Sequence, residues 1–90
     1  KIANERKASK GELVRLWINE SIADEIRNNP IHSSQRIEQE EIDGSVNIKL
    51  NMPITQELEY FILQHESNIK IHEPAELIAQ IKKLKSTMLF

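Results

Sequence analysis

The chain has no cysteine, and its 90 residues include only two glycines, three prolines and one tryptophan. Without cysteine it can form no disulfide, no thiolate nucleophile and no zinc–thiolate centre. With Gly11 and Gly44 as the only glycines, neither a dinucleotide-binding fingerprint nor a phosphate-binding P-loop is possible. No apolar run approaches the roughly 20 residues that cross a bilayer, and no signal peptide is visible. These absences favour a cytoplasmic protein that does not contact a membrane.

The chain also lacks a clear excess of either positive or negative charge. Hydrophobic residues make up 39% of the chain and charged residues 29%, with a formal net charge of −2. This balance is typical of a globular domain, and the length suits a single core. A domain that binds duplex DNA by itself usually carries an excess of Lys and Arg, because phosphate neutralisation supplies most of the affinity. We therefore expect any DNA binding by the whole protein to lie in another domain.

The first residues show no packing pattern. The stretch 1–11 is polar, begins with Lys1 and precedes the first apolar alternation. Such a composition is typical of a linker or of the remnant of an upstream element. We therefore expect the folded domain to span residues 12–90.

Alternation of apolar and polar residues predicts the strands. The pattern is clearest at Val46, Ile48, Leu50 and Met52, and the Asp43-Gly44 pair predicts a hairpin that joins a polar strand to this apolar one. The predicted strands cover 12–18, 34–42, 46–52 and 69–72.

Spacing and capping residues predict three helices. The first covers 20–27 with Ser21 as its cap, and the second follows Thr55, which can accept a hydrogen bond from its first turn. The third opens with Pro74 at its first helical position, where the missing N–H costs nothing.

The order of elements is β-α-β-β-α-β followed by a helix. Two right-handed βαβ crossovers joined by a hairpin predict the α+β class, as a ferredoxin-like βαββαβ sandwich with an additional C-terminal helix. In that topology the first and third strands are central and the second and fourth are edges. The polar character of the segment 34–42 suits an edge strand, where charges discourage stray pairing.

This fold divides the strand residues between two faces. The face expected beneath the helices carries Val14, Leu16, Ile18, Ile37, Val46, Ile48, Leu50, Ile69 and Ile71. The open face is expected to carry Arg15, Trp17, Arg36, Glu38, Glu40, Asn47, Lys49, Asn51, Lys70 and His72.

Trp17 has two interpretations. In the first, the terminal helix or another domain packs over the open face and buries the indole. In the second, the indole is a stacking platform for a nucleobase or another planar ligand, with nearby cations binding phosphate. Both make the same residues candidates for contact with a ligand or partner: Arg15, Trp17, Lys49, Lys70 and His72.

The histidines and glutamates of the sequence do not have the spacing of known catalytic or metal-binding motifs. His32, His65 and His72 have no metal-ligand spacing, and none belongs to an HExxH motif. Three glutamates on the second strand are interpreted as a solvated edge rather than a metal site: Glu38, Glu40 and Glu41. We therefore expect no catalytic residues, no metal and no cofactor, and we do not expect an enzyme.

The order and spacing of these pieces resemble a known family. The hairpin and strand at 43–50 precede a helix containing 57–63, and the short strand and Pro-x-x-Leu helix start lie at 69–77. With the earlier strand at 14–18 and helix at 22–26, this resembles the C-terminal extension (WCX) domain found behind the WYL domain in bacterial transcriptional regulators. The resemblance covers about residues 13–84.

The resemblance implies a non-catalytic regulatory and oligomerisation module. It implies upstream WYL and helix-turn-helix domains in the same chain, a homodimer, nucleic acid bound through the other domains, and a nucleotide or oligonucleotide ligand at the domain junction. This chain has neither the helix-turn-helix nor the Trp-Tyr-Leu motif. DNA binding therefore cannot be assigned to its residues, and no residue role transfers by name.

Two alternatives remain open at this point. The first is a free-standing small-molecule sensor of the same fold that pairs its sheets edge to edge. The second is a small enzyme of the ferredoxin-like dimeric class, which needs a histidine or an acid, such as His72, inside a cavity.

Overall fold

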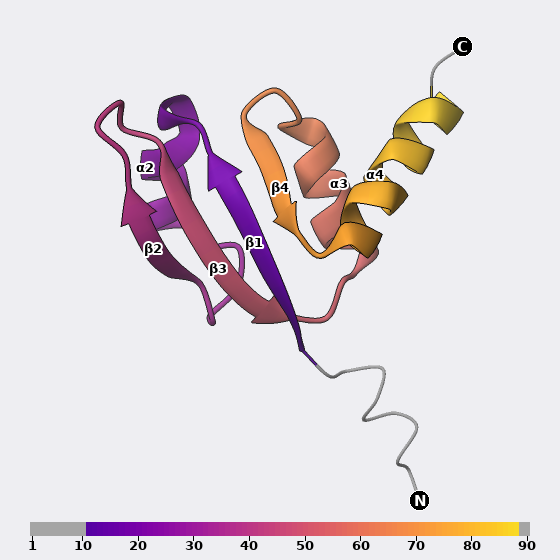
Figure 1. Ribbon diagram of the computed structural model, residues 1–90, viewed down its shortest axis with the longest axis horizontal. Helices are drawn as coiled ribbons and strands as arrows, with labels where there is room; N and C mark the ends of the chain where they lie inside the picture. The colour runs from indigo at the N-terminus through magenta and orange to yellow at the C-terminus, as the bar shows by residue number, and fades with distance from the viewer. Residues whose placement is uncertain (1–10, 89–90) are drawn as a thin grey trace, which may run out of the picture.

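The structure is a computed structural model that describes residues 11–88, and it belongs to the α+β class (Figure 1). The linker predicted at 1–11 lies outside the described residues, apart from Gly11. The elements follow the predicted order and are β1 (Glu12–Ile18), α2 (Glu20–Asn28), β2 (Arg36–Glu40), β3 (Val46–Met52), α3 (Gln56–Gln64), β4 (Ile69–Glu73) and α4 (Ala75–Met88).

The four strands form one antiparallel sheet in the order β2-β3-β1-β4. The first and third strands are central, as predicted, and the order is compatible with a ferredoxin-like sandwich. Helices α2 and α3 lie behind one face of the sheet, whereas α4 lies beside β4 and packs against β4 and α3 (Figure 1). No helix within residues 11–88 covers the opposite face of the sheet.

The core lies between the sheet and the helices. Val14, Leu16 and Ile18 of β1 are fully buried, and so are Val46, Ile48 and Leu50 of β3, as the alternation predicts. The helices contribute Ala23, Ile26, Leu58, Ile62, Leu77 and Ile81.

Two apolar residues of the edge strands are less buried than those of the central strands. Ile71 is only half-buried and packs at the margin of the core. Ile37 pairs with Ile48 in register and so lies on the predicted face, but it is 39% exposed and does not join the core. The physical reason is its position on an edge strand, where one flank of the side chain has no neighbouring strand to cover it.

Helix caps agree with the sequence in one case and differ in two. The Thr55 hydroxyl accepts a hydrogen bond from Leu58 N at 3.1 Å, as predicted. Asn19, not Ser21, caps α2, and its Oδ1 accepts from Ser21 N at 3.0 Å. Pro74 immediately precedes α4 instead of occupying its first helical position.

Candidate functional site

Each edge strand contains a β-bulge that sends two successive side chains to the open face. The β2–β3 register shifts between Ile37 and Gln39, and the β1–β4 register shifts next to Arg15. A bulge inserts one extra residue into the pairing and re-aims the side chains beside it. The side chains that become neighbours on the open face are Glu38 and Gln39 from β2, and His72 and Glu73 from β4.

The β2 bulge corrects the predicted face of one residue. Glu40 pairs with Val46 in register, and its carboxylate lies 3.2 Å from the Arg27 guanidinium of α2. Its predicted place on the open face is therefore wrong. Gln39 and Glu41 occupy the open face instead, and β2 contains no glycine or proline that could have signalled the bulge.

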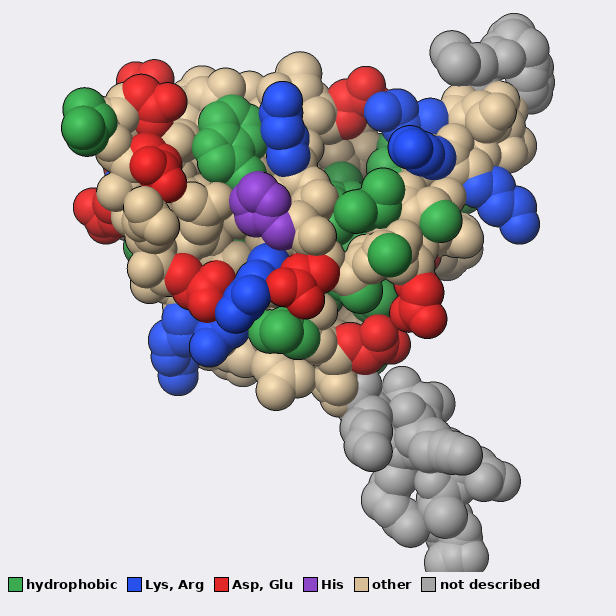
Figure 2. All heavy atoms as spheres, viewed as in Figure 1, with side chains coloured by type: hydrophobic (Ala, Val, Ile, Leu, Met, Phe, Trp, Pro, Cys, Tyr) green, Lys and Arg blue, Asp and Glu red, His purple; other side chains and the backbone are tan. Residues whose placement is uncertain are grey.

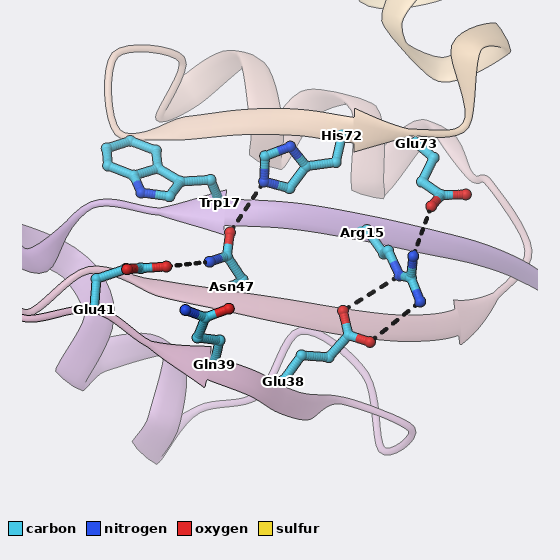
Figure 3. A pocket seen from close by; sticks show the side chains of 8 residues that line it. All are labelled: Arg15, Trp17, Glu38, Gln39, Glu41, Asn47, His72 and Glu73. Carbon is cyan, nitrogen blue, oxygen red and sulfur yellow. Dashed lines mark hydrogen bonds and ion pairs between the residues drawn. The ribbon is translucent and has the colours of Figure 1, made fainter.

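An ion-pair cluster ties three strands together across the open face (Figure 3). Arg15 on β1 lies between Glu38 of β2 and Glu73 of β4, and we call these three residues the Arg15 clasp. Arg15 Nη1 donates to Glu73 Oε2 at 2.9 Å and Nη2 donates to Glu38 Oε2 at 3.3 Å. Arg15 Nε lies 3.3 Å from Glu38 Oε1, in an ion pair without a hydrogen bond. Within the clasp the cationic charge of Arg15 is already matched by carboxylates.

A chain of polar groups runs beside the clasp. His72 Nε2 lies 3.0 Å from Asn47 Oδ1, and Asn47 Nδ2 donates to Glu41 Oε2 at 2.9 Å. Because the amide oxygen can only accept, His72 Nε2 carries the proton in this arrangement. These two hydrogen bonds fix the orientation of the three side chains, which come from three segments of the protein.

Trp17 lies half-buried on the central strand, between two open hollows. Lys70 Nζ lies 5.6 Å from the centroid of the indole, within the range of a cation–π contact. The larger hollow, of about 640 Å³, is lined by Arg15, Trp17, Glu38, Gln39, Glu41, Asn47, His72 and Glu73 (Figure 3). The smaller hollow, of about 490 Å³, is lined by Trp17, Glu41, Ile42, Asp43 and Ser45.

The terminal helix does not cover this face. Helix α4 lies beside β4 and against α3 (Figure 1), and Trp17 borders open hollows. Figure 2 shows acidic and basic side chains mixed across the sheet, below a hydrophobic patch and a histidine. The expectation that the terminal helix buries Trp17 is therefore wrong, whereas burial by another domain stays a prediction.

The predicted contact residues are brought together only in part. Arg15, Trp17 and His72 line the larger hollow, and Lys70 lies over the indole. Lys49 pairs with Arg15 in register but does not line either hollow on this face. Three carboxylates face one guanidinium in the larger hollow, so its surroundings are more acidic than the sequence alone indicates.

The hairpin between β2 and β3 borders the smaller hollow. Gly44 has a φ of 93°, a left-handed conformation that other residues rarely adopt. Ser45 donates to Asp43 Oδ1 from its hydroxyl at 2.7 Å and from its backbone N at 2.9 Å. These two hydrogen bonds lower the pKa of Asp43, the side-chain bond more than the backbone one. They hold the turn that presents Ile42, which is fully exposed.

The described residues contain neither a metal-binding cluster nor a membrane-spanning helix. Within residues 11–88, no three His, Asp or Glu side chains lie close enough together to hold a metal ion. Over the same residues, no helix combines the length and apolar character needed to cross a membrane.

The fold and the site define a small α+β module whose distinctive surface is an open, polar sheet face with one tryptophan. The chain belongs to the WCX domain family, which matches residues 10–89. This match confirms the resemblance seen in the hairpin, the helices and the Pro-x-x-Leu segment. No curated protein matches the chain.

Proposed function

We propose that this WCX domain is a non-catalytic regulatory and oligomerisation module of a WYL-type helix-turn-helix transcriptional regulator in the bacterial cytoplasm. In this proposal it adopts a ferredoxin-like sandwich, helps to assemble a dimer and tunes the response to a ligand sensed with the WYL domain. Membership of the WCX family supports the class of protein. The uncovered sheet face supports a role in contact with another domain or chain.

The observation that carries the proposal is the place of Trp17. A half-buried indole on a central strand, with ordered polar groups around it, is typical of the centre of a protein interface. Docking of an attached domain would bury the indole and exclude water from the polar groups beside it. The proposed contact residues remain Arg15, Trp17, Lys49, Lys70 and His72.

The mechanism is a shift between two arrangements of the regulator. If the open face contacts its partner more extensively in one arrangement, that contact stabilises it. A ligand at the domain junction that strengthens or weakens the same contact then changes the affinity of the distant DNA-binding domain. Nucleic acid is bound by the other domains in this proposal.

The polar groups of the site support a non-catalytic role. Arg15 is paired with two carboxylates, and the imidazole of His72 is hydrogen-bonded to an amide. Polar groups that are hydrogen-bonded or ion-paired to one another keep the surface in a fixed shape. A general base must instead reach a proton on a substrate. The hollows are open to solvent and leave His72 exposed. The arrangement thus gives no support to the enzyme alternative.

The free-standing sensor was expected to pair its sheets edge to edge. Both edge strands are bulged, and bulges interrupt the ladder that a second strand would join. The side chains of β2 are exposed and mostly charged, which further opposes such pairing. These features favour contact through the open face over contact through the edges.

The test uses the regulator that carries this chain, with Trp17→Ala in the domain. We expect the ligand-dependent change in operator affinity, measured by fluorescence anisotropy, to fall by about fivefold or more. Tyr60→Ala removes an exposed aromatic from α3 on the helix side and is the matched control. If both variants keep the ligand response and the sedimentation behaviour of the wild type, the proposed function is wrong.

A further inference from the structure

The centre of the open face combines an apolar patch with acidic surroundings. Ile42 is fully exposed at the hairpin tip and lines the smaller hollow together with Trp17. An exposed isoleucine and an indole that line the same hollow are candidate anchor points for a partner, since aromatic residues dominate binding at the centres of interfaces. The charges around this patch then decide which kind of partner fits.

The two hollows beside Trp17 contain an excess of negative charge. Their linings include four carboxylates, those of Glu38, Glu41, Asp43 and Glu73, but one guanidinium, that of Arg15. Lys70 lies over the indole but lines neither hollow. A phosphate brought to this surface would meet carboxylates at close range, and like charges across an interface cost free energy. The hollows therefore suit a cationic group better than a nucleic-acid backbone.

Not all of these carboxylates are equally engaged. Both oxygens of Glu38 and one oxygen of Glu73 lie against Arg15. Glu41 is half-buried and accepts from the neutral amide of Asn47, and no cation contacts it within the described part of the chain. Glu41 also lines both hollows, as Trp17 does. It is the carboxylate best placed to receive a cation from outside.

We infer that the open face docks a cationic segment of a partner protein, with an arginine guanidinium from that segment paired with Glu41 and taking the place of Lys70 against Trp17. The inference rests on the proposed function and names the chemistry of the surface that the domain contacts. Arginine fits better than lysine because its planar guanidinium can stack on the indole while its N–H groups donate to a carboxylate. The apolar stem of the arginine lies against Ile42.

The first experiment uses the full 90-residue chain and follows the emission of Trp17, its only tryptophan. The probe is an acetylated and amidated pentapeptide, Gly-Arg-Gly-Arg-Gly, at low salt. We expect a saturable change in emission, and a Kd about threefold weaker or more for the peptide with lysine in place of arginine. Free L-arginine as a probe tests whether a lone amino acid suffices, and its binding as tightly as the peptide would overturn docking of a protein segment.

The second experiment compares two charge-neutral variants. Glu41→Gln removes the proposed partner of the guanidinium, and we expect the Kd for the arginine peptide to rise about fivefold or more. Glu25→Gln makes the same change in charge on the exposed side of α2 and should leave the Kd unchanged. Equal effects of the two variants, or no emission change up to millimolar peptide, would overturn the inference. So would tighter binding of hexathymidylate than of the arginine peptide.

This inference and the proposed function can fail separately. If Trp17→Ala abolishes the ligand response of the regulator while the chain does not bind the arginine peptide, the function stands and the cationic partner is wrong. If the chain binds the peptide through Glu41 while Trp17→Ala leaves the regulator unaffected, the docking surface stands and the regulatory role is wrong.

Discussion

The two faces of this sheet are built from the same strands but follow different rules. On the helix-covered face the side chains of β1 and β3 are apolar and fully buried, and their stability comes from packing. On the open face the side chains are polar or aromatic, half-buried or exposed, and several are joined in pairs across the strands. The covered face holds the fold together, whereas the open face holds a surface in a defined shape.

The strongest test of this contrast removes a core side chain. Leu16 is fully buried on the covered face, and Leu16→Ala should lower the free energy of unfolding by about 3 kcal/mol, through lost burial and the cavity left behind. Urea denaturation followed by circular dichroism measures it. A loss below about 1 kcal/mol would mean that the covered face is not the main source of stability.

The next test moves one residue along the same strand to the other face. Trp17 has a larger side chain than Leu16, but it is only half-buried. Trp17→Ala should therefore cost about 1–2 kcal/mol, less than the leucine substitution. The same denaturation experiment applies, with circular dichroism as the probe because the fluorophore is lost. If Trp17→Ala costs as much as Leu16→Ala, the indole belongs to a core and not to a surface.

A smaller effect is expected from the Arg15 clasp. The side chains of Arg15, Glu38 and Glu73 are 40%, 32% and 41% exposed, so water screens their attraction. Arg15→Met should cost about 1 kcal/mol or less at low salt, and the cost should shrink as salt is added. Lys49→Met, at the position paired with Arg15 on β3, is the control. A salt-independent loss of several kcal/mol would show that the clasp is effectively buried.

The smallest effect concerns pH at the rim of the open face. Hydrogen bonds from Ser45 lower the pKa of Asp43 in the folded state. The stabilisation is therefore present above the pKa of the unfolded state and is lost as the pH falls below about 4, through the lower folded value. Asp43→Asn should lower the Tm at pH 7 but much less at pH 3. A Tm difference that is the same at both pH values would exclude this linkage, and Glu25→Gln gives the background change.

Most of the fold could be predicted because its central strands obey a simple period. The first and third strands have the predicted bounds, and their alternating residues lie on the predicted faces. The cap of α2 could not be predicted from the local sequence. Asn19 and Ser21 are both good caps, and the choice depends on a distant residue, since the Ser21 hydroxyl lies 3.2 Å from Asn68 Oδ1.

The site was harder to predict than the fold because it depends on register. Counting alternate residues along a regular strand places Glu40 on the open face and omits Gln39 and Glu73. The two bulges reverse this assignment, and register between strands far apart in sequence cannot be read from either strand alone. Arg15, Trp17 and Glu38 were placed correctly, whereas Glu40 was placed on the wrong face and Glu41 and Glu73 were missed.

The paired bulges also determine where this domain can change length during evolution. Deleting Glu38 would restore a regular pleat in β2 and remove one carboxylate partner of Arg15, while Glu40 would stay opposite Val46. A matching deletion near His72 would dismantle the contacts at the other edge. Insertions and deletions should therefore be tolerated in the segment 29–35 between α2 and β2, but be rare within β2 and β4, although both strands lie at the margins of the sheet.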